Sequence, residues 1–223
     1  MQPNYNFQKK YWERQKKRRV PQHPVIQAFV EPKLRYIDES LIKLNVSNQM
    51  SLLDIGCGNG FFTYYFEKLY QTFALDFSVS MLKKNSSSKK VCASAHKLPF
   101  VDQSFDILFC SNLLHHVENT DSIISEMKRV SRKYIILSEP NRDNPLMFLF
   151  GLLKKAERGT LKFSLQYMKN ILIKAGLSPI TSVQTGIILP NMTPEWLLPI
   201  LKKFDANFSL GFYNIVISER QSN

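Results

Sequence analysis

The sequence of 223 residues predicts an α/β fold in which a mostly parallel sheet carries helices on both faces. Short apolar segments alternate with amphipathic segments between residues 50 and 140, which is typical of parallel strands joined by crossover helices. A hydrophobic fraction of 44% is ordinary for a chain with a packed core, and the length fits one domain. We therefore expect a single domain over residues 1–223.

Seven segments have the length and composition of strands, and the segments between them have helical periodicity. The helix expected at 120–131 opens with Thr120 as a candidate N-cap, and the helix expected at 164–177 ends at Gly176. The expected strands are residues 50–56, 72–77, 90–95, 105–111, 133–140, 180–188 and 212–218, and the expected helices are residues 61–70, 78–85, 120–131, 144–159, 164–177 and 193–204.

The chain is strongly basic, with a formal net charge of +12. Residues 9–19 hold seven basic residues and one glutamate. Such a run either forms a solvated arm or binds an anionic polymer or lipid. The sequence contains no zinc-ligand spacing, RNA-binding signature or helix-turn-helix pattern, so a nucleic-acid partner stays the alternative and is not favoured.

Three cysteines, Cys57, Cys92 and Cys110, are too few for a disulfide framework and favour a reducing compartment. The N-terminus lacks the apolar segment of a signal peptide, and the apolar run at 145–153 is about half the roughly 20 residues that a membrane span needs. We therefore expect a cytoplasmic protein without a transmembrane segment. The segment at 144–159 has three open roles: a core helix, a cover over an apolar ligand, or a contact with a membrane surface.

Residues 52–60 read LLDIGCGNG, a buried strand followed by glycine at every second position. Glycines here let the backbone turn sharply and let a ligand approach the main chain at the carboxyl edge of the sheet. Gly60 comes one residue too early for a dinucleotide fingerprint, and Phe61 occupies that glycine's place. Asp76 ends the second expected strand, where its carboxylate can accept hydrogen bonds from ribose hydroxyls. The pattern predicts a ligand with a ribose and without a pyrophosphate against the helix start.

Four ordered motifs resemble those of the class I S-adenosylmethionine-dependent methyltransferases. LLDIGCGNG is similar to their first motif, ALDFSVSML at 74–82 to the second, and residues 94–117 to the third and fourth together. The resemblance is strongest to the small-molecule methyltransferases that include quinone-biosynthesis enzymes. It implies a Rossmann-like, mostly parallel seven-stranded sheet whose last strand is antiparallel, with S-adenosyl-L-methionine as cofactor.

The resemblance also implies a layout along the chain. Residues 1–47 would form a basic N-terminal cap segment, 48–140 the cofactor-binding half, 141–178 an acceptor-side insertion with a helix, and 179–223 the C-terminal strands and helix. Ser94 departs from the family, which usually has an aspartate that meets the adenine amino group. The implied cofactor-binding residues are Asp54, Gly56, Cys57, Gly58, Asn59, Gly60, Asp76, Phe77, Ser78, Ser94, Ala95, His96, Asn112 and Leu113.

Three residues are candidates for catalysis, because they follow expected strands at the ligand-binding edge. His115 and His116 come after the fourth strand, and a histidine near its usual pKa of about 6.5 suits proton removal at neutral pH. Glu139 ends the fifth strand and would orient a substrate donor. Each also has a purely structural alternative, as a residue that packs or caps a loop. No metal is expected.

Methyl transfer from a sulfonium is an in-line displacement, for which orientation alone supplies up to about 7–11 kcal/mol. The leading interpretation is an enzyme that methylates a small, apolar or aromatic acceptor. The alternatives are an RNA or protein methyltransferase that uses the basic arm, and a non-catalytic cofactor-binding partner of another methyltransferase. The sequence leaves the acceptor and the oligomeric state open.

Overall fold

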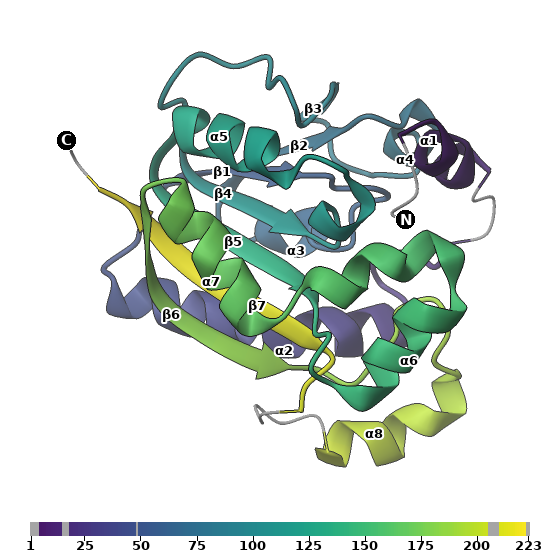
Figure 1. The fold of residues 1–223 in the computed structure, drawn as a ribbon. Coiled ribbons are helices and arrows are strands. Elements are labelled where there is room, and N and C mark those ends of the chain that lie inside the picture. The colour runs from purple at the N-terminus through teal and green to yellow at the C-terminus, as the bar shows by residue number, and fades with distance from the viewer. Residues whose placement is uncertain (1–4, 15–17, 48, 205–209, 222–223) are drawn as a thin grey trace.

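A computed structural model describes residues 5–14, 18–47, 49–204 and 210–221. Its centre is a seven-stranded sheet with the strand order β3-β2-β1-β4-β5-β7-β6 (Figure 1). Strands β1 to β5 pair in parallel, whereas β7 runs antiparallel to both β5 and β6. The predicted Rossmann-like sheet with an antiparallel last strand is therefore confirmed.

The strands agree with the predicted segments to within a few residues at each end. Strand β4 matches its prediction in full, and β6 begins and ends earlier than expected. The bounds are β1 Ser51–Ile55, β2 Gln71–Asp76, β3 Lys90–Cys92, β4 Phe105–Ser111, β5 Ser131–Pro140, β6 Leu177–Thr185 and β7 Tyr213–Arg220.

Helices cover both faces of this sheet, with α5 and α7 on one face and α2 and α3 on the other (Figure 1). The bounds of the α-helices are α1 Tyr5–Glu13, α2 Pro24–Lys43, α3 Thr63–Phe66, α4 Val79–Leu82, α5 Thr120–Val130, α6 Pro145–Leu153, α7 Leu165–Lys174 and α8 Leu198–Phe204. Three 3-10 helices are η1 Leu114–His116, η2 Lys155–Lys162 and η3 Glu195–Leu197.

Alternate residues of the central strands enter two separate cores, because side chains of a strand point to opposite faces in turn. On strand β4, Phe109 packs in the core under α2, and Leu108 packs in the core under α5 and α7. Both side chains are buried. Burial of the sheet on both faces explains why its strands are continuous apolar runs.

Helix α2 is the main element that the sequence analysis missed. His23 caps it by accepting a hydrogen bond from the Val25 N–H, and Pro24 occupies the first turn, where its missing N–H costs nothing. Pro32 lies inside the helix, which normally indicates a break. Val25, Phe29 and other buried residues of α2 pack against the sheet, and this tertiary packing outweighs the proline.

Two further local expectations need correction. The N-cap of α5 is Asn119, whose side chain accepts a hydrogen bond from the Ser122 N–H, rather than Thr120. The helix expected at 61–70 is reduced to the single turn of α3. Gly176 does follow the last turn of α7 with φ of +72°, as its predicted role requires.

Residues 18 and 19 of the predicted basic arm, together with residues 20–23 that follow it, lie against the body of the protein. Arg19 donates a hydrogen bond from Nη1 to the carbonyl of Pro190 at 2.8 Å, and the carbonyl of Arg19 accepts one from Asn59 Nδ2 at 2.9 Å. The expectation of a solvated arm is therefore wrong for this part, and residues 15–17 lie outside the described residues. Within the described ranges, we find no helix with the length and apolarity that crossing a membrane requires.

Candidate functional site

A cavity of about 410 Å³ opens at the carboxyl ends of β1, β2, β4 and β5. This is the edge at which open α/β sheets bind ligands. The glycine-rich turn and Asp76 line one part of the cavity, and His115, His116 and Glu157 line another. Tyr11 and Trp12 of α1, Met147 and Phe150 of α6, and residues 189–192 complete its walls.

The glycines of the turn after β1 have different roles. Gly56 and Gly58 adopt φ of +72° and +52°, which side chains rarely tolerate. A Cβ on Gly58 would meet no atom within 4 Å, so the backbone here faces open space in the cavity. A Cβ on Gly60 would lie 2.8 Å from the side chain of Asn85, so Gly60 is required for packing. Only the first two glycines line the cavity.

Asp76 is held in a fixed orientation at the end of β2. Its Oδ2 accepts a hydrogen bond from the Gly58 N–H at 2.8 Å, and its Oδ1 accepts one from the Ser78 N–H at 2.8 Å. Burial raises the pKa of the carboxyl, although these backbone donors oppose the rise. Each oxygen keeps a further lone pair, which fits two hydroxyls of a ribose.

Asp54 lies deeper, between β1 and α3. Its Oδ2 accepts a hydrogen bond from Thr63 Oγ1 at 2.6 Å. Burial raises its pKa to about 7, opposed by the Thr63 hydroxyl and reinforced by the charge of Asp76. Because Asp54 also lines the cavity, it lies within reach of a ligand amino group there.

The structure brings most of the predicted cofactor residues to this cavity. Asp54, Gly56, Cys57, Gly58, Asn59, Asp76, Phe77, Asn112 and Leu113 line it. Gly60 and Ser78 stand behind it, and Ser78 caps α4 by accepting a hydrogen bond from the Met81 N–H. Ser94, Ala95 and His96 are absent from its lining, and His96 Nδ1 lies 2.5 Å from Ser122 Oγ. Their predicted contacts with a cofactor stay predictions.

Glu139 is fully buried at the end of β5 and organises the loop after β4. Its Oε1 accepts hydrogen bonds from the backbone N–H groups of Leu113 and Leu114, at 3.0 and 2.8 Å. Its Oε2 lies 2.5 Å from His115 Nδ1. Glu139 does not line the cavity, so it positions the loop and the His115 ring and does not face a ligand.

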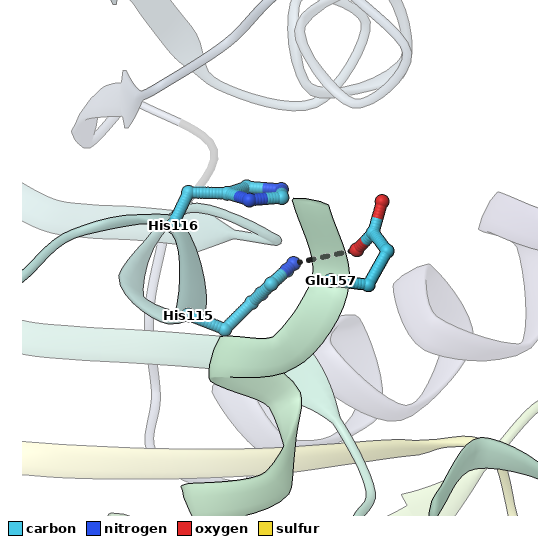
Figure 2. Close-up of side chains that lie close together, drawn as sticks. All are labelled: His115, His116 and Glu157. Carbon is cyan, nitrogen blue, oxygen red and sulfur yellow. Dashed lines mark hydrogen bonds and ion pairs between the residues drawn. The ribbon is translucent and has the colours of Figure 1, made fainter. Parts of the chain in front are cut away.

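His115 forms an ion pair with a second carboxylate, that of Glu157 in η2. The distance from His115 Nε2 to Glu157 Oε2 is 3.2 Å (Figure 2). Burial alone would lower the pKa of His115, but the charges and hydrogen bonds of Glu139 and Glu157 raise it to about 9. In turn, burial raises the pKa of Glu157, but the hydrogen bond from His115 and the neighbouring positive charges together lower it to about 2. At neutral pH these shifts favour an imidazolium on His115 beside an ionised Glu157.

His116 differs from its neighbour, because it is buried as a neutral ring. Burial and the charge of His115 lower its pKa to about 3. Its ring centroid lies 3.9 Å from that of His115 and 5.1 Å from that of Trp12. The ring hydrogen-bonds the backbone of Ala156, whereas Nδ1 has no hydrogen-bond partner among the described residues. This nitrogen is buried, although the ring lines the cavity.

The same three groups have the donor set of a cation site. One ligand atom from each of His115, His116 and Glu157 lies within 4.8 Å of the others, and Figure 2 shows the three side chains converging from two segments. A metal would have to replace the proton that His115 shares with Glu157, because a ligating imidazole nitrogen is deprotonated. The raised pKa of His115 opposes that exchange at neutral pH.

Glu157 and Arg18 are among the polar residues of the site that the sequence analysis missed. Arg18 lies in the cavity, with its guanidinium carbon 5.0 Å from the Trp12 ring centroid and 5.5 Å from that of Phe61. Burial lowers its pKa, and its Nε has no hydrogen-bond partner among the described residues. Neither placement was predicted from the sequence. Arg18 belongs to a basic run, and Glu157 lies 42 residues from His115 without a motif around it.

Comparison with known proteins supports this description. Residues 53–136 match the family model of the methyltransferase domain. An uncharacterized protein of Methanocaldococcus jannaschii is 33% identical over 109 residues, which cover 47% of this chain and 48% of that protein. A malonyl-[acyl-carrier protein] O-methyltransferase of Legionella pneumophila is 34% identical over 89 residues, 35% of this chain and 31% of the relative. A demethylmenaquinone methyltransferase of Mycolicibacterium paratuberculosis is 34% identical over 92 residues, 40% of each chain. The matched segments span half or less of these relatives.

Solved structures share the fold over most of the chain. A SAM-dependent methyltransferase from Aquifex aeolicus has a TM-score of 0.61 at 17% identity and covers 89% of this chain and 94% of its own. The magnesium protoporphyrin IX methyltransferase of Synechocystis, solved with bound SAH, has a TM-score of 0.61 at 15% identity, over 88% and 86% of the chains. A Haloferax volcanii methyltransferase complex with the Trm112 activator has a TM-score of 0.67 at 12% identity, over 95% and 98%.

Proposed function

We propose that this chain, whose residues 53–136 match the family model of the methyltransferase domain, uses S-adenosylmethionine to methylate a small, largely apolar acceptor at a protic oxygen or nitrogen. The observation that supports the proposal is the composition of the cavity. One part offers exposed backbone and the Asp76 carboxylate, and the other offers the Glu157 carboxylate beside apolar side chains. Such a cavity suits a nucleoside cofactor next to an apolar molecule with a hydrogen-bond donor.

The cofactor supplies an electrophilic methyl group on sulfur, and the residues of the chain align it. Asp76 fits the ribose hydroxyls, and the open backbone at Gly58 fits the methionine portion. Leu113 and Asn112 lie at the passage to the other part of the cavity. The backbone N–H of Leu113 is bonded to Glu139, which fixes this passage.

At the other part, Glu157 is placed to accept a hydrogen bond from the hydroxyl or amine of the acceptor and so orients it. The bond from this heteroatom to the methyl carbon forms as the carbon–sulfur bond breaks, and the electron pair of that bond stays on sulfur. A hydroxyl acceptor becomes a protonated ether, which is far more acidic than a carboxylic acid, so its proton passes to Glu157 despite the low pKa of that carboxyl. An amine acceptor becomes an ammonium and loses its proton to solvent after release. His115 acts as a positioning residue, because both of its ring nitrogens face carboxylates.

The walls of the cavity favour a small acceptor over a polymer. Tyr11 and Trp12 of α1 and Met147 and Phe150 of α6 line the cavity, whose whole volume is about 410 Å³, a size that suits small molecules. Arg18 points into the cavity and Arg19 is bonded to Pro190, so these two arginines are not available to bind a nucleic acid. RNA or protein methylation is therefore the less favoured alternative.

A carboxylate acceptor is a second candidate, favoured by Arg18. Its guanidinium lies in the cavity with an unpartnered Nε, and an arginine fork pairs with carboxylates in two parallel hydrogen bonds. One relative is named malonyl-[acyl-carrier protein] O-methyltransferase, so by its name it transfers methyl to an oxygen of a malonyl group. Such an acceptor has no proton to lose, so it would not need Glu157.

An acceptor panel separates these candidates. Release of demethylated cofactor is measured with apolar phenols, amines and carboxylic acids, with Glu157→Gln and Arg18→Gln variants and with exposed Glu118→Gln as the matched control. Phenols or amines as substrates, with kcat lowered at least about tenfold by Glu157→Gln and little changed by Glu118→Gln, support the proposal. Turnover only of carboxylates, with sensitivity confined to Arg18→Gln, supports the second candidate. Methylation of RNA or protein but of no small acceptor overturns both.

A further inference from the structure

Helix α6 exposes most of its apolar surface. Of its nine residues, Met147 and Gly151 are buried, whereas Leu146, Leu149 and Leu153 are exposed in one row along the helix. Phe148 and Leu152 form a second exposed row. Leu153 is 78% exposed, a large fraction for a residue of this kind. An ordinary surface helix hides its apolar stripe and shows charged residues, so α6 has the opposite pattern.

A further exposed apolar row lies on η3 and α8. Trp196, Ile200 and Phe204 are spaced four residues apart and therefore share one face of this helical segment, and all three are exposed. Trp196 is 75% exposed. Leu198 on the other side is buried against the core that contains α2. The helix is thus anchored by one face and presents the other.

The apolar rows of α6 and the apolar row of η3 and α8 flank the same cavity. Met147 and Phe150 of α6 line it from one side, and residues 189–192, which lead into η3, line it from another. Exposed Met192 connects this wall with the outer surface. In the view of Figure 1, α6 and α8 both lie at the lower right of the molecule. We call Leu146, Phe148, Leu149, Leu152, Leu153, Met192, Trp196, Ile200 and Phe204 the apolar rim.

Basic residues surround the apolar rim. Lys155, Arg158 and Lys162 follow α6, and Lys202 and Lys203 lie on α8, all exposed. The acidic residues of these segments are Glu157, which is paired with His115, and Glu195. Apolar side chains with a tryptophan, bordered by lysines and arginines, match the boundary between headgroups and acyl chains of an anionic bilayer.

We propose that the apolar rim docks this protein onto the surface of an anionic lipid bilayer. A second copy of the chain is a poor occupant, because each copy carries a net charge of +12 and the basic borders would face one another. A bilayer buries the rim and neutralises the lysines at the same time. If the proposed function holds, this docking places the cavity mouth where an apolar acceptor could enter from the lipid.

Vesicle flotation tests the docking without any acceptor. The full chain is mixed with vesicles of phosphatidylcholine alone or of phosphatidylcholine with phosphatidylglycerol, at low and high salt. We expect binding to the anionic vesicles that weakens with salt, and a partition coefficient at least about tenfold lower for Leu149→Glu/Leu153→Glu. Val101→Glu is the matched control, because Val101 is 79% exposed in the loop before β4, away from the rim.

Size-exclusion chromatography of the same variants supplies the competing outcome. Absence of vesicle binding by a monomeric wild type overturns the proposal, as does binding that both leucine substitutions leave unchanged. A dimer that Leu149→Glu/Leu153→Glu dissociates, without vesicle binding, assigns the rim to a second copy instead. Failure of methyl transfer would leave the vesicle result standing, because docking requires neither cofactor nor acceptor.

Discussion

His115 Nδ1 lies 2.5 Å from Glu139 Oε2, although the two residues are 24 positions apart and come from different strand ends. This pair joins the loop after β4 to the end of β5, and the other oxygen of Glu139 accepts the N–H groups of Leu113 and Leu114. The second nitrogen of His115 faces Glu157. A buried carboxylate thus sets the protonation of a histidine, which in turn holds the carboxylate that faces the cavity.

The stability of the protein should fall as pH rises from 7 to 9. The folded-state pKa of His115 is raised from 6.5 to about 9, so its contribution is fully present below pH 6.5 and is lost as pH rises through about 9. Asp54, with a pKa raised from 3.8 to about 7, contributes stability that is lost as pH rises through about 7, so the part of the slope above about pH 8 belongs mainly to His115. The slope approaches about 1.4 kcal/mol per pH unit for one proton.

Denaturant unfolding at several pH values measures this slope. His115→Gln should be less stable at pH 7 and should have a flatter profile between pH 7 and 9, because it removes the titrating ring. His96→Gln is the control, since His96 is exposed. A wild-type profile as flat as that of His115→Gln would show that His115 is not protonated in the folded state.

The sequence was sufficient for the sheet and for the position of the glycine turn and Asp76 at its carboxyl edge. Continuous apolar runs marked the strands, and the glycine turn with Asp76 marked the ligand edge, because both are local patterns. His115 and Glu139 were both predicted as site residues, but not their contact, which depends on two strand ends meeting in space.

Other features could not be predicted, because tertiary contacts override or create them. Helix α2 was not predicted. It contains Pro32, which normally indicates a break, and its stability comes from packing on the sheet. Glu157 lies in a 3-10 helix without a motif, and only the fold brings it 3.2 Å from His115. Arg18 looked like part of a solvated arm, yet it lies between Trp12 and Phe61.

Substitution of Asp76 should weaken cofactor binding. Asp76→Ala removes the acceptor for ribose hydroxyls and also releases the Gly58 N–H that orients the turn. We expect a loss of roughly 1.5–3 kcal/mol, the range for hydrogen bonds to a charged group. Calorimetry with S-adenosylmethionine and with its demethylated product measures the loss, and Glu118→Ala should bind as the wild type does. Equal affinity of Asp76→Ala and wild type would show that Asp76 does not bind the cofactor.

Chelation of metal ions should leave the protein unchanged at neutral pH. The proton on His115 already compensates Glu157, and a metal would have to displace it. We expect the same melting temperature and the same cofactor affinity before and after EDTA treatment, and no bound metal by elemental analysis. A stoichiometric metal whose removal lowers the melting temperature, in the wild type but not in His116→Gln, would assign the cluster of His115, His116 and Glu157 to that ion.

Phe148 and Phe150 should separate the surface of α6 from its cavity wall. Phe148 is 41% exposed, whereas Phe150 lines the cavity. Because neither is fully buried, Phe148→Ala and Phe150→Ala should each cost well under the about 3–5 kcal/mol of a core phenylalanine. Phe150→Ala should raise the acceptor KM or lower kcat while cofactor affinity stays constant, since it removes a contact on the acceptor side only.

Thermal melts and cofactor calorimetry check the stability and the binding before an acceptor is known, and kinetics with the panel substrate completes the comparison. A large destabilisation by both substitutions would show that α6 acts as a core helix. Equal kinetics for Phe150→Ala and Phe148→Ala would show that the acceptor does not contact Phe150.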